Sequence, residues 1–89
     1  KHTLSVGDTP VKVGLVEFRL LSYLMAHPER VFTRSQLLDS VWGDHVFIEE
    51  RTVDVHVLRL RKALATADAQ HLVQTVRGIG YRLSGKPEQ

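Results

Sequence analysis

Residues 51–62, Arg-Thr-Val-Asp-Val-His-Val-Leu-Arg-Leu-Arg-Lys, decide the fold of this 89-residue chain. On a helix that turns about 100° per residue, four apolar side chains here and just beyond fall in one narrow sector. They are Val53, Val57, Leu60 and Leu64. The spacing therefore predicts an amphipathic helix that docks on a core through this stripe and leaves its other side exposed.

The exposed side of this helix carries cations, a hydroxyl and a branched apolar side chain. Its members are Arg51, Thr52, Val55, Arg59 and Lys62, with His56 on one shoulder and Asp54, Leu58 and Arg61 on the other. In a DNA major groove, arginine can grip guanine, threonine and valine can contact thymine methyls, and lysine or histidine can meet phosphates. A basic stripe is more often only a solvated face, so the helix alone does not establish DNA binding.

A second basic element follows the helix. Residues 72–83, Leu-Val-Gln-Thr-Val-Arg-Gly-Ile-Gly-Tyr-Arg-Leu, alternate in the manner of a β-hairpin and place Arg77 in the turn. A basic helix followed by a basic-tipped hairpin is typical of a winged helix. The predicted fold is thus α+β: three helices, a C-terminal hairpin wing and a remnant of an N-terminal antiparallel sheet.

Composition limits the class of protein. The length fits one domain, which we place at residues 1–83, followed by a flexible tail at 84–89. No apolar run approaches the ~20 residues of a membrane span, and no signal peptide is evident, so we expect a soluble protein without membrane contacts. The absence of cysteine fits the cytoplasm. The missing initiator methionine suggests a fragment of a longer protein.

Charge is unevenly spread along the chain. Residues 1–50 carry five Lys or Arg against seven Asp or Glu, whereas residues 51–86 carry seven against two. This asymmetry indicates a polyanionic partner for the second half of the chain.

The first half of the chain has the pattern of a structural scaffold. Residues 3–13 alternate around a Gly-Asp-Thr-Pro turn and predict a hairpin. Residues 15–26 predict a helix with Phe18, Leu21 and Met25 on its buried side, widened by Leu20 and Leu24. Thr33 and Gln36 match a capping box that opens a second helix, which Gly43 ends.

The connector at residues 43–49 is too long for a tight helix-turn-helix corner and unusually apolar. Val46, Phe47 and Ile48 could cover the core, or they could form a protein-contact patch beside Trp42. The sequence favours neither interpretation over the other.

Together these segments resemble the C-terminal effector domain of OmpR/PhoB-type response regulators, most of all the members that control the phosphate regulon. The matching motifs are Glu17-Phe18-Arg19-Leu20-Leu21, His27-Pro28-Glu29-Arg30-Val31, Val41-Trp42-Gly43, Arg51-Thr52-Val53-Asp54-Val55-His56, Leu60-Arg61-Lys62 and Val76-Arg77-Gly78-Ile79-Gly80-Tyr81-Arg82. The resemblance implies a phosphate-responsive activator of transcription, with an upstream receiver domain that this chain lacks.

The resemblance also implies roles for particular residues. Arg51, Thr52, His56, Arg59, Arg61 and Lys62 would face DNA. Thr75, Arg77 and Tyr81 would form the wing and contact DNA from it, and Trp42, Gly43 and Ile48 would contact the RNA polymerase sigma subunit. Domains would bind direct repeats in double-stranded DNA as a tandem head-to-tail dimer. This chain departs at Leu58, where close relatives carry a basic residue, and at Ser35, where they carry an acid.

Two other classes of function compete with DNA binding. An enzyme is disfavoured because the five histidines lack metal-ligand spacing and no nucleophile, base and orienting residue can be grouped; no cofactor is expected. A winged helix that serves mainly protein-protein contacts is the stronger alternative, and an affinity that ignored salt would favour it.

Overall fold

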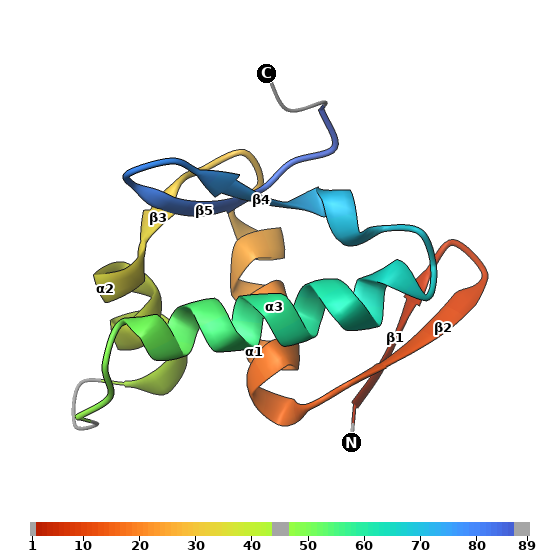
Figure 1. Cartoon of the computed structure of the whole chain (residues 1–89). Helices are drawn as coiled ribbons and strands as arrows, with labels where there is room; N and C mark the ends of the chain where they lie inside the picture. The colour runs from red at the N-terminus through yellow and green to blue at the C-terminus, as the bar shows by residue number, and fades with distance from the viewer. Residues whose placement is uncertain (1, 44–46, 87–89) are drawn as a thin grey trace.

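The computed structural model describes residues 2–43 and 47–86, in which helices lie between two small antiparallel sheets (Figure 1). In chain order the elements are β1 (His2–Val6), β2 (Thr9–Val13), α1 (Leu15–Ala26), β3 (Phe32–Thr33), α2 (Arg34–Leu37), the π-helical turn η1 (Leu38–Trp42), α3 (Arg51–Ala65), the 3-10 turn η2 (Gln70–Leu72), β4 (Val73–Val76) and β5 (Gly80–Leu83). The predicted winged helix is confirmed: β4 and β5 form the wing hairpin beside α3.

The wing is part of a three-stranded sheet in the order β3-β5-β4. Phe32 pairs with Tyr81, and Thr75 pairs with Tyr81 from the other side. The strand β3 immediately precedes α2, so this sheet ties the wing to the start of the second helix. A Cβ added at Gly80 would lie 1.9 Å from the Phe32 carbonyl oxygen, so only glycine permits this close pairing.

The N-terminal hairpin forms as expected. Strand β1 pairs with β2 from His2 opposite Val13 to Val6 opposite Thr9. Val11 and Val13 are buried, and the residues between and before them are exposed, which is the period of two that a half-buried strand requires.

Helix α1 begins and ends where the sequence predicted, but its buried face is rotated. Leu20, Leu21 and Leu24 are buried, whereas Met25, expected in the stripe, is 59% exposed. The buried spacing of i, i+3, i+4 and i+7 starts at Glu17, a charged residue that an apolar pattern does not count. The expected stripe was therefore displaced around the helix by one residue.

The second helix starts at the expected capping box. The Thr33 hydroxyl accepts a hydrogen bond from the Gln36 amide at 3.1 Å, and the Gln36 side chain accepts one from the Thr33 amide at 2.9 Å. After one turn the helix widens into the π-helical turn η1, which the sequence did not predict. Gly43 ends it with a φ of 95°, a conformation that glycine adopts without strain.

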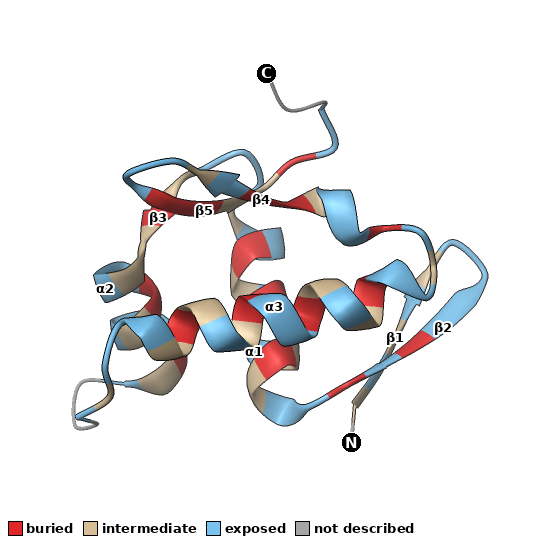
Figure 2. Ribbon diagram, viewed as in Figure 1, coloured by how far each residue is buried: buried red, intermediate tan, exposed pale blue. Residues whose placement is uncertain are grey.

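The core lies where α1, α3 and the two sheets meet (Figure 2). Ser84, which the sequence analysis assigned to the tail, belongs to the folded body: it is 1% exposed, and its amide donates to the Leu72 carbonyl at 2.9 Å. The Gln74 side chain also donates to the Lys86 carbonyl at 2.7 Å. Residues 87–89 of the expected tail lie outside the described residues.

Candidate nucleic-acid interface

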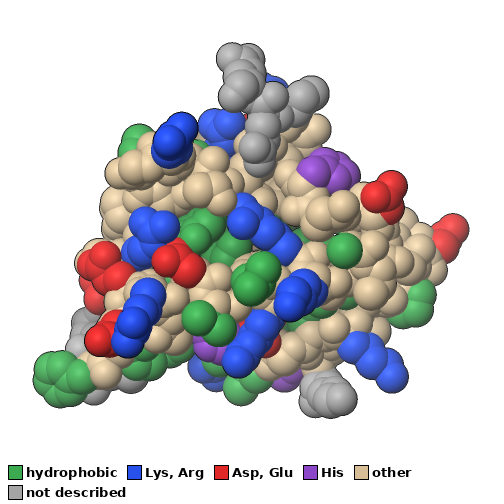
Figure 3. Space-filling view, in the orientation of Figure 1, with side chains coloured by type: hydrophobic (Ala, Val, Ile, Leu, Met, Phe, Trp, Pro, Cys, Tyr) green, Lys and Arg blue, Asp and Glu red, His purple; other side chains and the backbone are tan. Residues whose placement is uncertain are grey.

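Helix α3 buries the predicted stripe and presents the opposite face to solvent. Val53, Val57, Leu60 and Leu64 are each no more than 1% exposed, as expected. Arg51, Val55, Arg59 and Lys62 are exposed, and Thr52 is partly so. Lys and Arg side chains gather over α3 and the wing, while Asp and Glu lie mostly toward the edges of this face (Figure 3).

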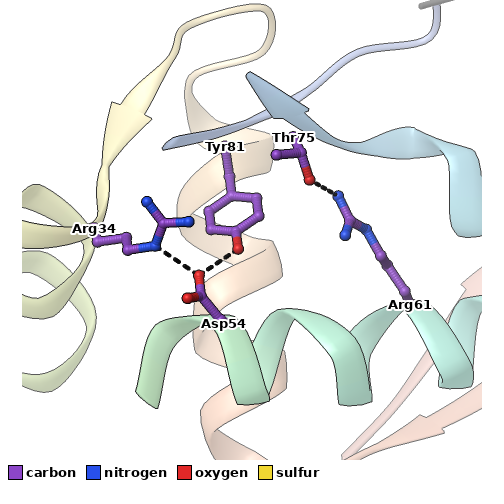
Figure 4. Close-up of polar contacts among 5 residues, drawn as sticks. All are labelled: Arg34, Asp54, Arg61, Thr75 and Tyr81. Carbon is purple, nitrogen blue, oxygen red and sulfur yellow. Dashed lines mark hydrogen bonds and ion pairs between the residues drawn. The ribbon is translucent and has the colours of Figure 1, made fainter. Parts of the chain in front are cut away.

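The wing is fastened to α3 by a three-residue cluster. The Asp54 carboxylate on α3 accepts hydrogen bonds from the Tyr81 hydroxyl of β5 and, at 2.7 Å, from Nε of Arg34 on α2 (Figure 4). The Arg34 guanidinium also lies 5.5 Å from the centre of the Tyr81 ring, a distance that allows a cation-π contact. One carboxylate thus connects the second helix, the basic helix and the wing.

Arg61 makes a second connection between α3 and the wing. Its Nε donates to the Val73 carbonyl at 2.9 Å, and its Nη2 donates to the Thr75 hydroxyl at 2.7 Å (Figure 4). Its guanidinium lies 5.6 Å from the Tyr81 ring centre. Arg61 and Thr75, both expected to face DNA, are therefore bonded to each other and position β4 against the helix.

Tyr81 requires a correction. The family resemblance implies that it faces DNA, but it is only 5% exposed. Its ring is enclosed by Arg34 and Arg61, and its hydroxyl is committed to Asp54. We conclude that Tyr81 positions the wing.

His56 is also turned inward. Its Nδ1 is hydrogen-bonded to Oε2 of Glu17 on α1, its side chain is 16% exposed, and its ring lies 5.4 Å from that of Trp42 in an edge-to-face arrangement. The prediction that His56 meets DNA therefore rests on the 16% of its side chain that is exposed. The reason is Glu17, a buried carboxylate that must find a partner and that sequence reasoning missed.

The electrostatics of the Asp54 cluster favour its charged form. Burial opposes ionisation of Asp54, but the hydrogen bonds from Tyr81 and Arg34 outweigh it, so the pKa of this carboxyl lies below its usual value. Burial, reinforced by the hydrogen bond to Asp54, raises the pKa of the Tyr81 hydroxyl. The cluster therefore holds Asp54 as an anion paired with a neutral phenol, and its charge is offset by Arg34.

The tip of the wing presents one cation. Arg77 is exposed at the second position of a turn closed by a hydrogen bond from the Ile79 amide to the Val76 carbonyl at 2.9 Å. Gly78 follows with a φ of 78°, as a type II turn requires at its third position. The turn chemistry thus projects Arg77 away from the body of the domain.

The connector before α3 is described only in part, because Val46 lies outside the described residues. Phe47 is fully exposed, Ile48 is half-buried, and Trp42 is half-buried against the core. One of the two interpretations of the connector required Phe47 to cover the core, and Phe47 does not do so. Trp42 does pack against the core.

Neither a metal-ligand cluster nor a membrane-spanning helix occurs in residues 2–43 and 47–86. No group of three or more His, Asp or Glu side chains in this part of the chain could hold a metal ion. None of the helices that the structure describes is long and apolar enough to cross a membrane.

Comparison with known proteins assigns the domain. Residues 8–83 match the family described as "Transcriptional regulatory protein, C terminal". The chain belongs to this family. As an effector domain of the OmpR/PhoB type it is 54% identical over 85 residues to the phosphate regulon transcriptional regulatory protein PhoB of Klebsiella pneumoniae, and 59% identical over 82 residues to that of Rhizobium meliloti. The two alignments cover 96% and 92% of this chain but only 37% and 36% of those relatives.

Solved effector domains share the fold. The AdeR DNA-binding domain, in complex with an intercistronic region, superposes with a TM-score of 0.84 at 33% identity, covering 96% of this chain and 87% of that one. The Klebsiella pneumoniae RstA DNA-binding domain, in complex with the RstA box, gives 0.77 at 30% identity, covering 92% and 82%. These likenesses confirm the winged helix.

Proposed function

We propose that this domain binds specific sites in double-stranded DNA and so regulates transcription, as the effector part of a phosphate-responsive response regulator. Helix α3 enters the major groove, and the wing reaches the adjacent minor groove. Relatives named PhoB and neighbours solved on DNA support this function.

The observation that carries the proposal is the set of free cations on one face. Arg59, Lys62 and Arg77 are exposed and make no ion pair with any described residue, whereas Arg51 is paired with Glu49 at 2.7 Å. Asp54, the only acidic residue within α3, is already paired with Arg34. Phosphates can therefore approach without displacing an internal salt bridge except at Arg51.

The test is a salt titration of binding to a duplex selected from a random library. The logarithm of affinity should fall with the logarithm of salt concentration with a slope of about −0.9 per phosphate contacted. Lys62→Ala and Arg77→Ala should each reduce that slope by about one. An affinity that ignores salt would instead support a domain used for protein contacts.

We also propose the partners that the resemblance implies. Trp42, Gly43 and Ile48, together with the exposed Phe47, form a surface for the sigma subunit of RNA polymerase, and two domains bind direct repeats head to tail. The exposure of Phe47 supports a protein contact, because a fully exposed phenylalanine contributes nothing to the core. Such a regulator would act in the cytoplasm.

A further inference from the structure

We infer that Leu58, together with Val55, selects thymine through its C5-methyl group at the base pairs that meet the wing side of α3. The inference deepens the proposed DNA binding and rests on it. It assigns a specificity role to an exposed apolar position on α3.

Both side chains lie exposed on the basic face. Leu58 is 53% and Val55 45% exposed, and they are three residues apart on α3, so they are neighbours on its surface. Hydrophobic side chains are visible among the Lys and Arg side chains that cover this helix (Figure 3). Together they form a small apolar ridge between cations.

The fold does not account for this ridge. Neither residue belongs to the buried core or to the partly buried side chains packed against it. Valine is also a weaker helix former than alanine, lysine or glutamate, so an exposed valine within α3 has no local benefit. Single exposed apolar residues are ordinary, but two adjacent ones at the centre of a proposed DNA-contacting face call for a partner.

The polar neighbours of Leu58 on the wing side of α3 are already engaged in internal hydrogen bonds. Asp54, one turn before, is bonded to Tyr81 and Arg34, and Arg61, three residues after, is bonded to Val73 and Thr75. Both polar neighbours are committed to holding the wing. Leu58, between them, is the side chain left free to approach a base edge.

The chemistry of the major groove then identifies the base. Leucine neither donates nor accepts hydrogen bonds, and the only apolar group that a standard base presents in the major groove is the thymine methyl. Against a G·C pair, leucine would take polar base atoms away from water without replacing their hydrogen bonds, which is unfavourable. The ridge should therefore favour thymine and disfavour G·C pairs.

Replacing thymine by deoxyuridine tests the inference, because it removes only the methyl group. Each thymine of a selected duplex is replaced in turn, and binding is measured by fluorescence anisotropy for the unmodified domain, Leu58→Ala and Val55→Ala. At the thymine read by Leu58 we expect affinity of the unmodified domain to fall about fourfold, the factor that corresponds to ~0.8 kcal/mol for one buried methyl.

Variants identify the residue responsible. Leu58→Ala should bind the thymine and deoxyuridine duplexes equally at that position, and Val55→Ala should lose sensitivity at the same or the adjacent position. Leu15→Ala is the matched control, because Leu15 is similarly exposed at 47% but lies at the start of α1. It should keep the full fourfold effect.

Two failures can be told apart. Salt-dependent binding in which Leu58→Ala retains the sensitivity of the unmodified domain at every thymine overturns the thymine contact and leaves the proposed function standing. Absence of salt-dependent binding to any duplex overturns both.

Discussion

The Tyr81 hydroxyl on β5 donates a hydrogen bond to the Asp54 carboxylate on α3, across 27 residues of sequence, and so sets where the wing lies relative to the basic helix. In the proposed binding mode the helix and the wing enter two different grooves, so the spacing between them must be fixed. This bond and the contacts of Arg61 are the means by which the chain holds it.

We expect Tyr81→Phe to destabilise the domain. The change keeps the ring but removes the hydroxyl, and hydrogen bonds to charged groups are worth ~1.5–3 kcal/mol. Because Asp54 keeps Arg34 and its side chain is 40% exposed, we expect about 1 kcal/mol, seen as a fall of ~4–8 °C in melting temperature. Tyr23→Phe is the matched control, since the Tyr23 hydroxyl bonds no described residue. Equal effects of the two changes would contradict the role of Tyr81.

The acid stability of the domain should depend on Asp54. Its folded pKa lies below the usual ~3.9, so its contribution to stability is present above that value and is lost as pH falls through the folded pKa. Urea denaturation below ~pH 5 should therefore show a shallower decline in stability for Asp54→Asn than for the unmodified domain. Parallel declines would show that Asp54 does not contribute to acid unfolding.

How much of the structure the sequence predicted depends on how far apart in the chain the interacting residues lie. The stripe on α3, the capping box of Thr33 and both hairpins depend on residues a few positions apart, and the structure has them as expected. The inward turn of His56 depends on Glu17, which lies 39 residues earlier, and that of Tyr81 on Asp54. Helical periodicity places a residue on a face, but it does not reveal a buried partner on another element.

Arg59 and Lys62 should differ in what they recognise. Arg59 is exposed near the centre of the α3 face and is free of internal bonds among the described residues, so it can pair bidentately with a guanine. Arg59→Ala should cost ~1–3 kcal/mol of discrimination between cognate and random duplexes. Lys62→Ala, which removes a proposed phosphate contact, should weaken binding to both duplexes by the same factor. Equal losses on both duplexes for Arg59→Ala would make Arg59 a phosphate contact as well.

Two substitutions in the surface before α3 should separate an effect on folding stability from an effect on polymerase contact. Phe47 is fully exposed, so Phe47→Ala should leave the melting temperature and DNA affinity unchanged and weaken the complex of domain, DNA and RNA polymerase in a gel shift. Trp42 packs against the core and His56, so Trp42→Ala should cost about 2 kcal/mol of folding stability, less than a fully buried tryptophan. An unchanged polymerase complex with Phe47→Ala would contradict the proposed surface.

Binding to direct repeats should depend on their rotational phase. Two domains on the same side of the duplex need half-sites about one helical turn, ~10–10.5 base pairs, apart. Head-to-tail contact joins unlike surfaces, and the excess of acidic residues before position 51 and of basic residues after it makes such surfaces complementary. Cooperative binding measured by gel shift should therefore be strong at the native spacing.

An insertion of about half a turn between the repeats places the second domain on the opposite side of the duplex, so cooperativity should disappear while the affinity of each half-site stays the same. Insertion of a full turn restores the phase but separates the two surfaces by roughly 34 Å. That distance is too large for direct contact between domains whose longest extent is 37 Å and which already lie one turn apart. A full-turn insertion should therefore restore part of the cooperativity at most. Cooperativity that survives the half-turn insertion would rule out contact between neighbouring domains.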